Sequence, residues 1–282
     1  LLSVVGLLTM LTGAYLGLKQ HDLKALLAYS TISQLGVLVV LIGQDTEIAF
    51  KALVIGVLAH ALYKSALFLV AGIVDHSAGS RDLRRLGGLV KSLPFTFLIG
   101  GAAALSMAGL PPLFGFLAKE TLLSTVTHPS VPQAVNVLFP ALTVVSGALV
   151  FAQAGMLMWD TFLGQPRDPS LHPHKVPWGM LLAPALPALI PLAGGLMPEP
   201  EFLASMLADA AAEVYGAPVK VSLAVWTGIN VPLLLSVVAV SLGTALFFTR
   251  HRIRAQQRRI SERWSLNTLY VGALAFIDHG TA

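Results

Sequence analysis

Residues 59–70 read AHALYKSALFLV and place a lysine in the middle of a hydrophobic run. Between positions 48 and 74 the only charged or imidazole side chains are those of Lys51, His60 and Lys64. A run of this length is long enough to cross the hydrocarbon core of a bilayer as a helix. An ionisable group at that depth costs several kcal/mol unless it faces a partner or water, so Lys64 is a candidate functional residue.

The composition of the whole chain indicates a polytopic membrane protein of the all-α class. Of its 282 residues, 55% are hydrophobic and 11% are charged, whereas soluble domains carry about 25% charged residues. About eight apolar runs approach the roughly 20 residues that a membrane-spanning helix needs. They cover 1–18, 25–42, 48–74, 92–110, 113–126, 134–163, 179–197 and 221–248. The sequence contains no cysteine, which excludes disulfides, thiolate-ligated clusters and a thiol nucleophile.

The polar links between these runs outline the topology. The link at 75–91 is basic, and the short polar link at 19–24 lies on the same side of the membrane, so both are expected on the cytoplasmic side. A proline-rich loop at 164–177 contains His172 and His174. Two imidazoles with no third ligand nearby do not make a metal site, and we interpret both as solvated loop residues.

Two further segments are predicted at the membrane surface. Residues 199–215 carry acids among alanines and leucines, which favours an interfacial amphipathic helix. Residues 250–263 carry six arginines and suit a cytoplasmic anchor at anionic lipid. The net charge of +4 therefore reflects loop placement and not nucleic-acid binding. Simple alternation of spans puts 250–263 and 75–91 on opposite faces, so the sequence leaves the absolute orientation open.

A helix break is predicted at Pro111-Pro112, because proline lacks a backbone donor and clashes with the preceding turn. Lys119 and Glu120 follow within three turns. Interrupted membrane helices are tolerated where they line protein or water, and they mark ion sites in transporters. We therefore predict that the break admits water and that Lys119, beside Glu120, gates the exit of a pathway. The alternative is an interfacial ion pair that caps a short helix.

His60 and Lys64 are four residues apart, so their side chains lie on one helix face. An imidazole exchanges protons near neutral pH, and burial favours the neutral form of an amine. We interpret the two residues as neighbouring stations of a proton wire, with water bridging the gaps. The alternatives are a structural lysine bound to backbone carbonyls and a histidine that serves packing.

Lys24 lies at the start of a helix and is a third candidate station. The hydroxyl and amide side chains that follow it are expected to line a hydrated path: Tyr29, Ser30, Ser33 and Gln34. Asp22 is the neighbour expected to modulate the charge of Lys24. Since lysines near helix ends extend easily to the interface, position alone does not decide for function.

Three motifs follow one another at 22–36 (DLKALLAYSTISQLG), 60–69 (HALYKSALFL) and 105–120 (LSMAGLPPLFGFLAKE). In sequence and order they resemble the proton-translocating antiporter-like subunits. That family joins membrane subunits of respiratory complex I to the multisubunit, Mrp-type cation/proton antiporters. The segments 73–89 (IVDHSAGSRDLRRLGGL) and 226–236 (WTGINVPLLLS) most resemble the large A subunits of the Mrp type.

The resemblance implies two inverted five-helix repeats, each with a broken helix, around a central chain of lysines and histidines. The polypeptide would contain the second repeat, with Lys24, Lys64 and Lys119 as stations and Lys119 on the broken helix. The first repeat and a downstream part would lie outside it, so an internal fragment is expected. Residues 1–18 lack the features of a signal peptide, and 264–277 look like an apolar segment cut short, in agreement with this expectation.

The chain departs from the family pattern at two positions. Gly56 stands where the family often has a histidine, one turn before His60. Thr227 follows Trp226 where a histidine is common. One station of the relay would then be water.

The leading function is a proton-translocating component of a cation/proton antiporter in the bacterial plasma membrane. Its expected partners are other subunits of a hetero-oligomeric complex, membrane lipid, H⁺ and Na⁺ or another monovalent cation. The alternatives are a proton-pumping component of a complex I-like NADH:quinone oxidoreductase and a structural membrane scaffold. No glycine-rich nucleotide fingerprint and no set of cluster ligands occurs, so we predict neither an enzyme nor a bound cofactor or metal.

Three regions are predicted along the chain. Residues 1–163 would form the proton-conducting second repeat. Residues 164–248 would add further membrane helices, the proline-rich loop and the interfacial helix. Residues 249–282 would form the basic surface segment and the start of the next helix.

Overall fold

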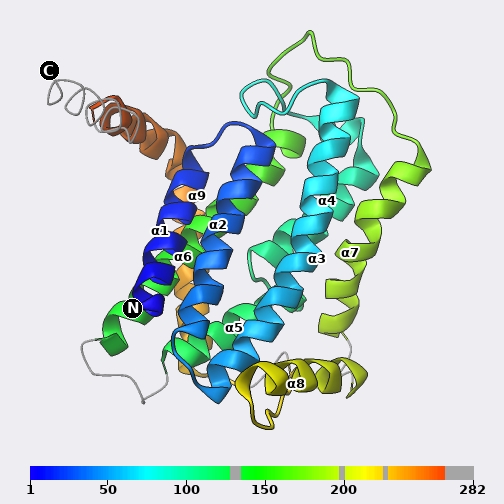
Figure 1. Ribbon diagram of the computed structural model, residues 1–282. Helices are drawn as coiled ribbons and strands as arrows, with labels where there is room; N and C mark the ends of the chain where they lie inside the picture. The colour runs from blue at the N-terminus through cyan, green and yellow to red at the C-terminus, as the bar shows by residue number, and fades with distance from the viewer. Residues whose placement is uncertain (128–134, 197–200, 225–227, 264–282) are drawn as a thin grey trace, which may run out of the picture. The chain divides into compact units, whose positions relative to one another are not determined.

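The computed structural model describes residues 1–127, 135–196, 201–224 and 228–263. All regular secondary structure in these ranges is helical, which confirms the all-α prediction (Figure 1). The chain forms two compact units, Leu1–Phe247 and Phe248–Ala282. The contacts described below lie within the first unit. The division into three functional regions stays a prediction.

Nine α-helices occur in the described residues, together with a short 3₁₀ turn and a π-helical turn. They are α1 (Leu2–Lys19), α2 (Leu23–Ile42), α3 (Glu47–Ala78), η1 (Leu89–Lys91), α4 (Pro94–Met107), α5 (Phe114–Val126), α6 (Val135–Met158), η2 (Trp159–Leu163), α7 (Trp178–Leu196), α8 (Glu201–Tyr215) and α9 (Val231–Arg263). Helices α1, α2 and α3 lie side by side, and α8 lies across one end of α3, which it contacts (Figure 1).

The expectation of about eight spans needs correction. Five helices of the described chain are each long and apolar enough to cross a membrane: α1, α2, α3, α6 with η2, and α9. Helices α4 and α5 have 14 and 13 residues, which is short of a full crossing. The apolar part of α7, Trp178–Gly194, is also short, and α7 contains three internal prolines. Within the predicted run at 221–248, helix α9 begins at Val231.

The start of α9 has a local cause. The side chain of Asn230 accepts a hydrogen bond from the backbone N–H of Leu233 at 2.9 Å, which is an N-cap interaction. Pro232 follows inside the first turn, where its missing N–H costs nothing. Hydrophobicity alone therefore extended this predicted span too far towards the N-terminus.

Helices α1 and α2 touch through glycines that bring their backbones close together. A β-carbon on Gly36 would lie 2.7 Å from the carbonyl oxygen of Gly6, and one on Gly13 would lie 2.5 Å from the backbone nitrogen of Ser33. Small residues allow such approaches between membrane helices, where packing replaces the hydrophobic driving force. The α1–α2 pair therefore forms a rigid wall beside α3.

A leucine at Gly36 is expected to destabilise the fold, because its side chain meets the backbone of α1. Overpacking costs about 1–3 kcal/mol when neighbours can adjust, and here the neighbouring atoms are backbone. Gly72→Leu is the matched control, since nothing lies within 4 Å of a β-carbon there. Thermal unfolding of the purified complex should show a lower midpoint for Gly36→Leu alone; equal midpoints for both variants would contradict the packing account.

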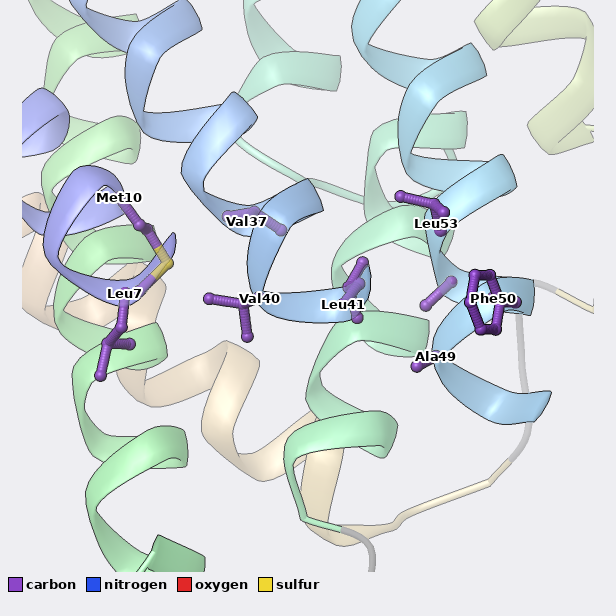
Figure 2. Packing of buried hydrophobic residues seen from close by; sticks show 9 residues of the cluster. Leu7, Met10, Val37, Val40, Leu41, Ala49, Phe50 and Leu53 are labelled. Atoms are coloured by element: carbon purple, nitrogen blue, oxygen red, sulfur yellow. The ribbon is translucent and has the colours of Figure 1, made fainter. Parts of the chain in front are cut away.

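Two apolar clusters hold the helices that carry the site. The first joins α1, α2 and α3 (Figure 2). Its members are Leu7, Met10, Val37, Val40, Leu41, Ala49, Phe50, Ala52 and Leu53. The second joins α5, α6 and α9 through Leu123, Val126, Val144 and Ala239. Leu122 and Phe139 pack against both clusters, so the helices form one continuous core around the site.

The predicted break at Pro111-Pro112 is present between α4 and α5. The chain leaves α4 with Gly109 at φ +67°, a conformation that favours glycine. It then re-enters helix at Phe114. Gly115 packs directly on Ser106, whose hydroxyl accepts a hydrogen bond from the Gly115 N–H at 3.3 Å. The two short helices are thereby held against each other across the break.

The loop at 164–175 is fixed to the link that follows α3. The guanidinium of Arg167 donates to the carbonyl oxygens of Leu83 and Leu86 and pairs with the carboxylate of Asp160 at 2.9 Å. Asp168 pairs with Arg85 at 2.7 Å. Hydrogen bonds from Ser170 and Arg85 lower the pKa of Asp168 to about 2. The Asp168 carboxylate is therefore ionised throughout the physiological range.

His174 is exposed, as expected for a solvated loop residue, and it is also hydrogen-bonded to the end of α3. Its backbone N–H donates to the carbonyl of Ser77 at 3.2 Å, and the Ser77 hydroxyl donates back to the His174 carbonyl at 2.5 Å. The ring Nε2 lies 3.1 Å from the carbonyl oxygen of His76. His174 therefore anchors the loop to the C-terminal end of α3.

Candidate functional site

Lys64 lies in the interface between α3 and α2, with 5% of its surface exposed. Its ammonium donates to the carbonyl oxygen of Leu27 at 2.8 Å and to the hydroxyl of Ser30. Both partners lie on the same stretch of α2. The ammonium is thus directed inward and solvated by protein oxygens, as predicted for an intramembrane lysine that does not face lipid.

His60 makes a contact that the sequence analysis did not anticipate. Its Nδ1 lies 3.1 Å from the hydroxyl oxygen of Tyr63, and the two rings are in edge contact. The structure gives no hydrogen bond between His60 and Lys64 within the described residues, so the two are not directly bonded stations. Tyr63 is buried and lines the cavity described next, which places it between His60 and that cavity.

A cavity of about 80 Å³ lies at the centre of the helices. It extends from α2 and α3 to the break before α5, and it reaches α6 and α9. Among the residues lining it, the polar side chains are those of Ser33, Gln34, Tyr63, Ser106, Lys119, Thr143 and Ser146. A water needs roughly 10–15 Å³ of such space and two to four polar partners. The cavity is therefore large and polar enough for several waters.

Lys119 projects into this cavity from α5. A β-carbon on Gly109 would lie 3.0 Å from Cδ and 3.3 Å from Nζ of Lys119, so the lysine stem rests on the glycine of the break. Its Nζ lies 5.7 Å from the centre of the Phe116 ring. Within the described residues Nζ has no hydrogen bond and no ion pair. The break thus makes room for an amine that faces the cavity.

Two serines connect the surroundings of Lys64 to the cavity. Ser33 lies one helical turn after Ser30 on α2, a rise of about 4.5 Å. Its hydroxyl donates to the carbonyl of Met10 at 2.8 Å and lies 3.3 Å from the hydroxyl of Ser146 on α6. The Lys64 ammonium is thus bonded to Ser30, and Ser33, one turn further along α2, lines the cavity.

Lys24 lies apart from this path. Its ammonium pairs with Asp75, at the end of α3, at 3.2 Å, and the two side chains are 40% and 37% exposed. Neither Lys24 nor Tyr29 lines the cavity. The predicted neighbour of Lys24 is wrong: the Asp22 carboxylate accepts from the N–H of Ala25 and pairs with Arg81 at 3.0 Å. The Asp22 carboxylate serves as the N-cap of α2, and Lys24 pairs instead with Asp75, which the fold brings close to it.

Glu120 is hydrogen-bonded to helix α9. Its carboxylate accepts a hydrogen bond from the hydroxyl of Ser236 on α9. No ion pair between Lys119 and Glu120 is found in the described residues, where the partner of the Glu120 carboxylate is Ser236. The alternative of an interfacial ion pair capping α5 is therefore not what the structure contains.

The two departures from the family pattern differ in how far the structure describes them. Gly56 lines the cavity, and a β-carbon there would lie 3.4 Å from Leu38 and 3.9 Å from the amide nitrogen of Gln34. Space that a side chain would occupy is open at this position. Trp226 and Thr227 lie outside the described residues.

The sequence of this chain matches a known family of membrane proteins. The family described as "NADH:quinone oxidoreductase/Mrp antiporter, TM" matches residues 1–146. The chain belongs to this family. The part of the chain that matches contains Lys24, Lys64 and Lys119, as well as the break before α5. Helix α9, which contributes Ser236 and Ala239 to the surroundings of the site, lies beyond the matched residues.

Among proteins of this family, the chain is similar to A subunits of cation/proton antiporters. The A subunit of the Na(+)/H(+) antiporter of Bacillus subtilis (strain 168) is 34% identical over 306 residues, which take in 100% of this chain and 38% of that protein. The A/B subunit of a probable K(+)/H(+) antiporter of Rhizobium meliloti (strain 1021) is 37% identical over 251 residues, covering 88% of this chain and 25% of that protein. The predicted resemblance to the A subunits of antiporters is thereby confirmed.

A solved structure shows the same fold. A chain of the Mrp complex from Dietzia sp. DQ12-45-1b matches with a TM-score of 0.84 and 34% identity, over 99% of this chain and 30% of that chain. The chain thus spans well under half the length of each of these relatives. Together with its five long apolar helices, this family membership identifies a multi-pass membrane protein.

Proposed function

We propose that this chain conducts protons as part of the A subunit of an Mrp-type cation/proton antiporter. The observation that supports it most is the polar cavity between Lys64 and Lys119. Lys64 is hydrogen-bonded to the Leu27 carbonyl and the Ser30 hydroxyl, and Ser30 lies one helical turn before Ser33, which lines the cavity. The other lysine reaches into it without a hydrogen-bonding partner in the described chain. Lys64 is buried, Lys119 lines the cavity, and the cavity has room for water.

In this mechanism the two amines alternate between charged and neutral forms. The Lys64 ammonium gives a proton to the Ser30 hydroxyl, which releases its own proton to a water molecule that leads into the cavity beside Ser33. The cavity water passes a proton to the neutral amine of Lys119. A hydroxyl is both donor and acceptor, which suits such a relay.

The counter-movement of Na⁺ or another monovalent cation belongs to the assembled antiporter. The chain is accordingly proposed to be part of a transporter and not an enzyme, with the other subunits, H⁺, the cation and membrane lipid as its partners in a bacterial plasma membrane. The named relatives differ in cation, since one belongs to a Na(+)/H(+) antiporter and one to a probable K(+)/H(+) antiporter. Transport by the whole complex in vesicles, with Na⁺ and K⁺ compared against an imposed pH gradient, identifies the cation.

The second candidate is a proton-pumping component of a complex I-like NADH:quinone oxidoreductase, which the same family includes. The same lysine path would serve it, driven by redox partners. The identity to named antiporter subunits over the whole chain favours the first candidate. A structural scaffold is the third, and the variants of Lys64 and Lys119 separate it from both.

Replacing Lys119 by arginine tests whether this residue must release a proton. Arginine keeps its charge at all accessible pH values. We expect Lys119→Arg to lower proton-driven cation transport to the level of the neutral variant Lys119→Met, with assembly retained. Transport in vesicles is the measurement. An active arginine variant beside an inactive methionine variant would mean that Lys119 supplies only a positive charge.

A further inference from the structure

Helix α9 contributes one polar side chain to the Lys119 end of the site. Ser236 is 3% exposed, and its hydroxyl donates to Oε1 of the half-buried Glu120. Ala239, one turn further along α9, lines the cavity and packs with Leu123 and Val144. The serine is therefore held in place by the packing of α9 against α5 and α6.

The Ser236 hydroxyl binds the carboxylate of the residue that directly follows Lys119 in sequence. Among the described residues lining the cavity, Lys119 carries the only charge, and Tyr63 of α3 is the only other titratable side chain. The remaining polar groups there, from α2, α4 and α6, are neutral. Among the described residues, Glu120 is the carboxylate that acts electrostatically on Lys119, and its Oε1 is bound to Ser236.

We propose that Ser236 is a positioning residue for proton transfer, which holds the Glu120 carboxylate on α9 and so keeps the Lys119 amine free to exchange protons with the cavity. An ammonium paired with a carboxylate retains its proton more strongly. A freed Glu120 side chain would turn towards Lys119 and trap it in the charged form. This inference rests on the proposed proton path and adds a residue beyond the part of the chain that the family match covers.

The test is the pH dependence of cation transport by the complete complex in vesicles. For Ser236→Ala we expect the half-maximal point to move to higher pH by about one unit, because Lys119 then needs a more alkaline medium to release its proton. Ser236→Thr keeps the hydroxyl and should restore the normal profile. In Glu120→Gln combined with Ser236→Ala no carboxylate remains to pair with Lys119, so the profile should return towards the original pH.

Ser241→Ala is the matched control on the same helix, since the Ser241 hydroxyl bonds only the carbonyl of Val237 one turn back. Assembled complex is quantified for every variant, and Ser236→Thr reports on packing at this position. If Ser236→Ala gives the same profile as Ser241→Ala while Lys119→Met is inactive, the role of Ser236 is refuted and the proton path stands. If Lys119→Met transports normally, the proposed path itself fails.

Discussion

Replacing Lys64 by methionine is expected to abolish proton-coupled cation transport while the complex still assembles. Methionine keeps the length and the apolar stem of lysine but carries no proton. The fold tolerates the loss because the Ser30 hydroxyl also donates to the carbonyl of Leu27 at 2.9 Å, so this pair remains satisfied without the ammonium. Vesicles containing the complete complex should then show only the background flux of vesicles without it.

Lys51 offers a matched control on the same helix. It lies near the N-terminal end of α3, four residues after Glu47, and does not line the cavity. Lys51→Met removes the same charge from α3 and should leave transport near normal. Normal transport by Lys64→Met would remove Lys64 from the proton path and favour the scaffold function.

The inward placement of Lys64 was predictable, and its partners were not. The residue lies more than two turns from either end of its apolar run, so its ammonium had to find oxygen atoms inside the protein. Which oxygens it finds depends on the pairing of α3 with α2, more than 30 residues away in sequence. Lys24 shows the same limit, since its partner Asp75 is 51 residues distant and the adjacent Asp22 caps a helix.

The cavity wall was only half predicted. Ser33 and Gln34 follow a candidate lysine and were identified by that proximity. Thr143 and Ser146 were missed, because small hydroxyl residues are common in membrane helices and usually bond their own backbone. Their spacing of three residues puts both on one face of α6, and this was the available signal. Ser236 carries no such signal, since only the packing of α9 brings it to Glu120.

The second large effect is expected from filling the cavity without touching either lysine. Gly56 lines the cavity on α3, and the atoms nearest to a new β-carbon there are side-chain ends of Leu38 and Gln34 at 3.4 and 3.9 Å. The β-carbon of a leucine at this position makes ordinary contacts with α2, and we expect the rest of its side chain to occupy cavity space that the path needs for water. The cavity has room for several waters, so one isobutyl group displaces a large share of them.

Gly56→Leu should therefore lower transport about as strongly as Lys64→Met while leaving stability intact. Added apolar contacts fill a void here, so no overpacking cost of the kind expected at Gly36 arises. Gly72→Leu is the control on the same helix, because a β-carbon there meets nothing within 4 Å. Thermal unfolding of both variants separates a blocked path from a damaged fold.

The most direct measurement is the initial rate of proton flux in vesicles that contain the complete complex with Gly56→Leu, under an imposed cation gradient. The proposed path predicts flux near background, with the Gly72→Leu complex close to normal and both complexes equally stable. Normal flux through the Gly56→Leu complex would show that protons do not pass through this cavity.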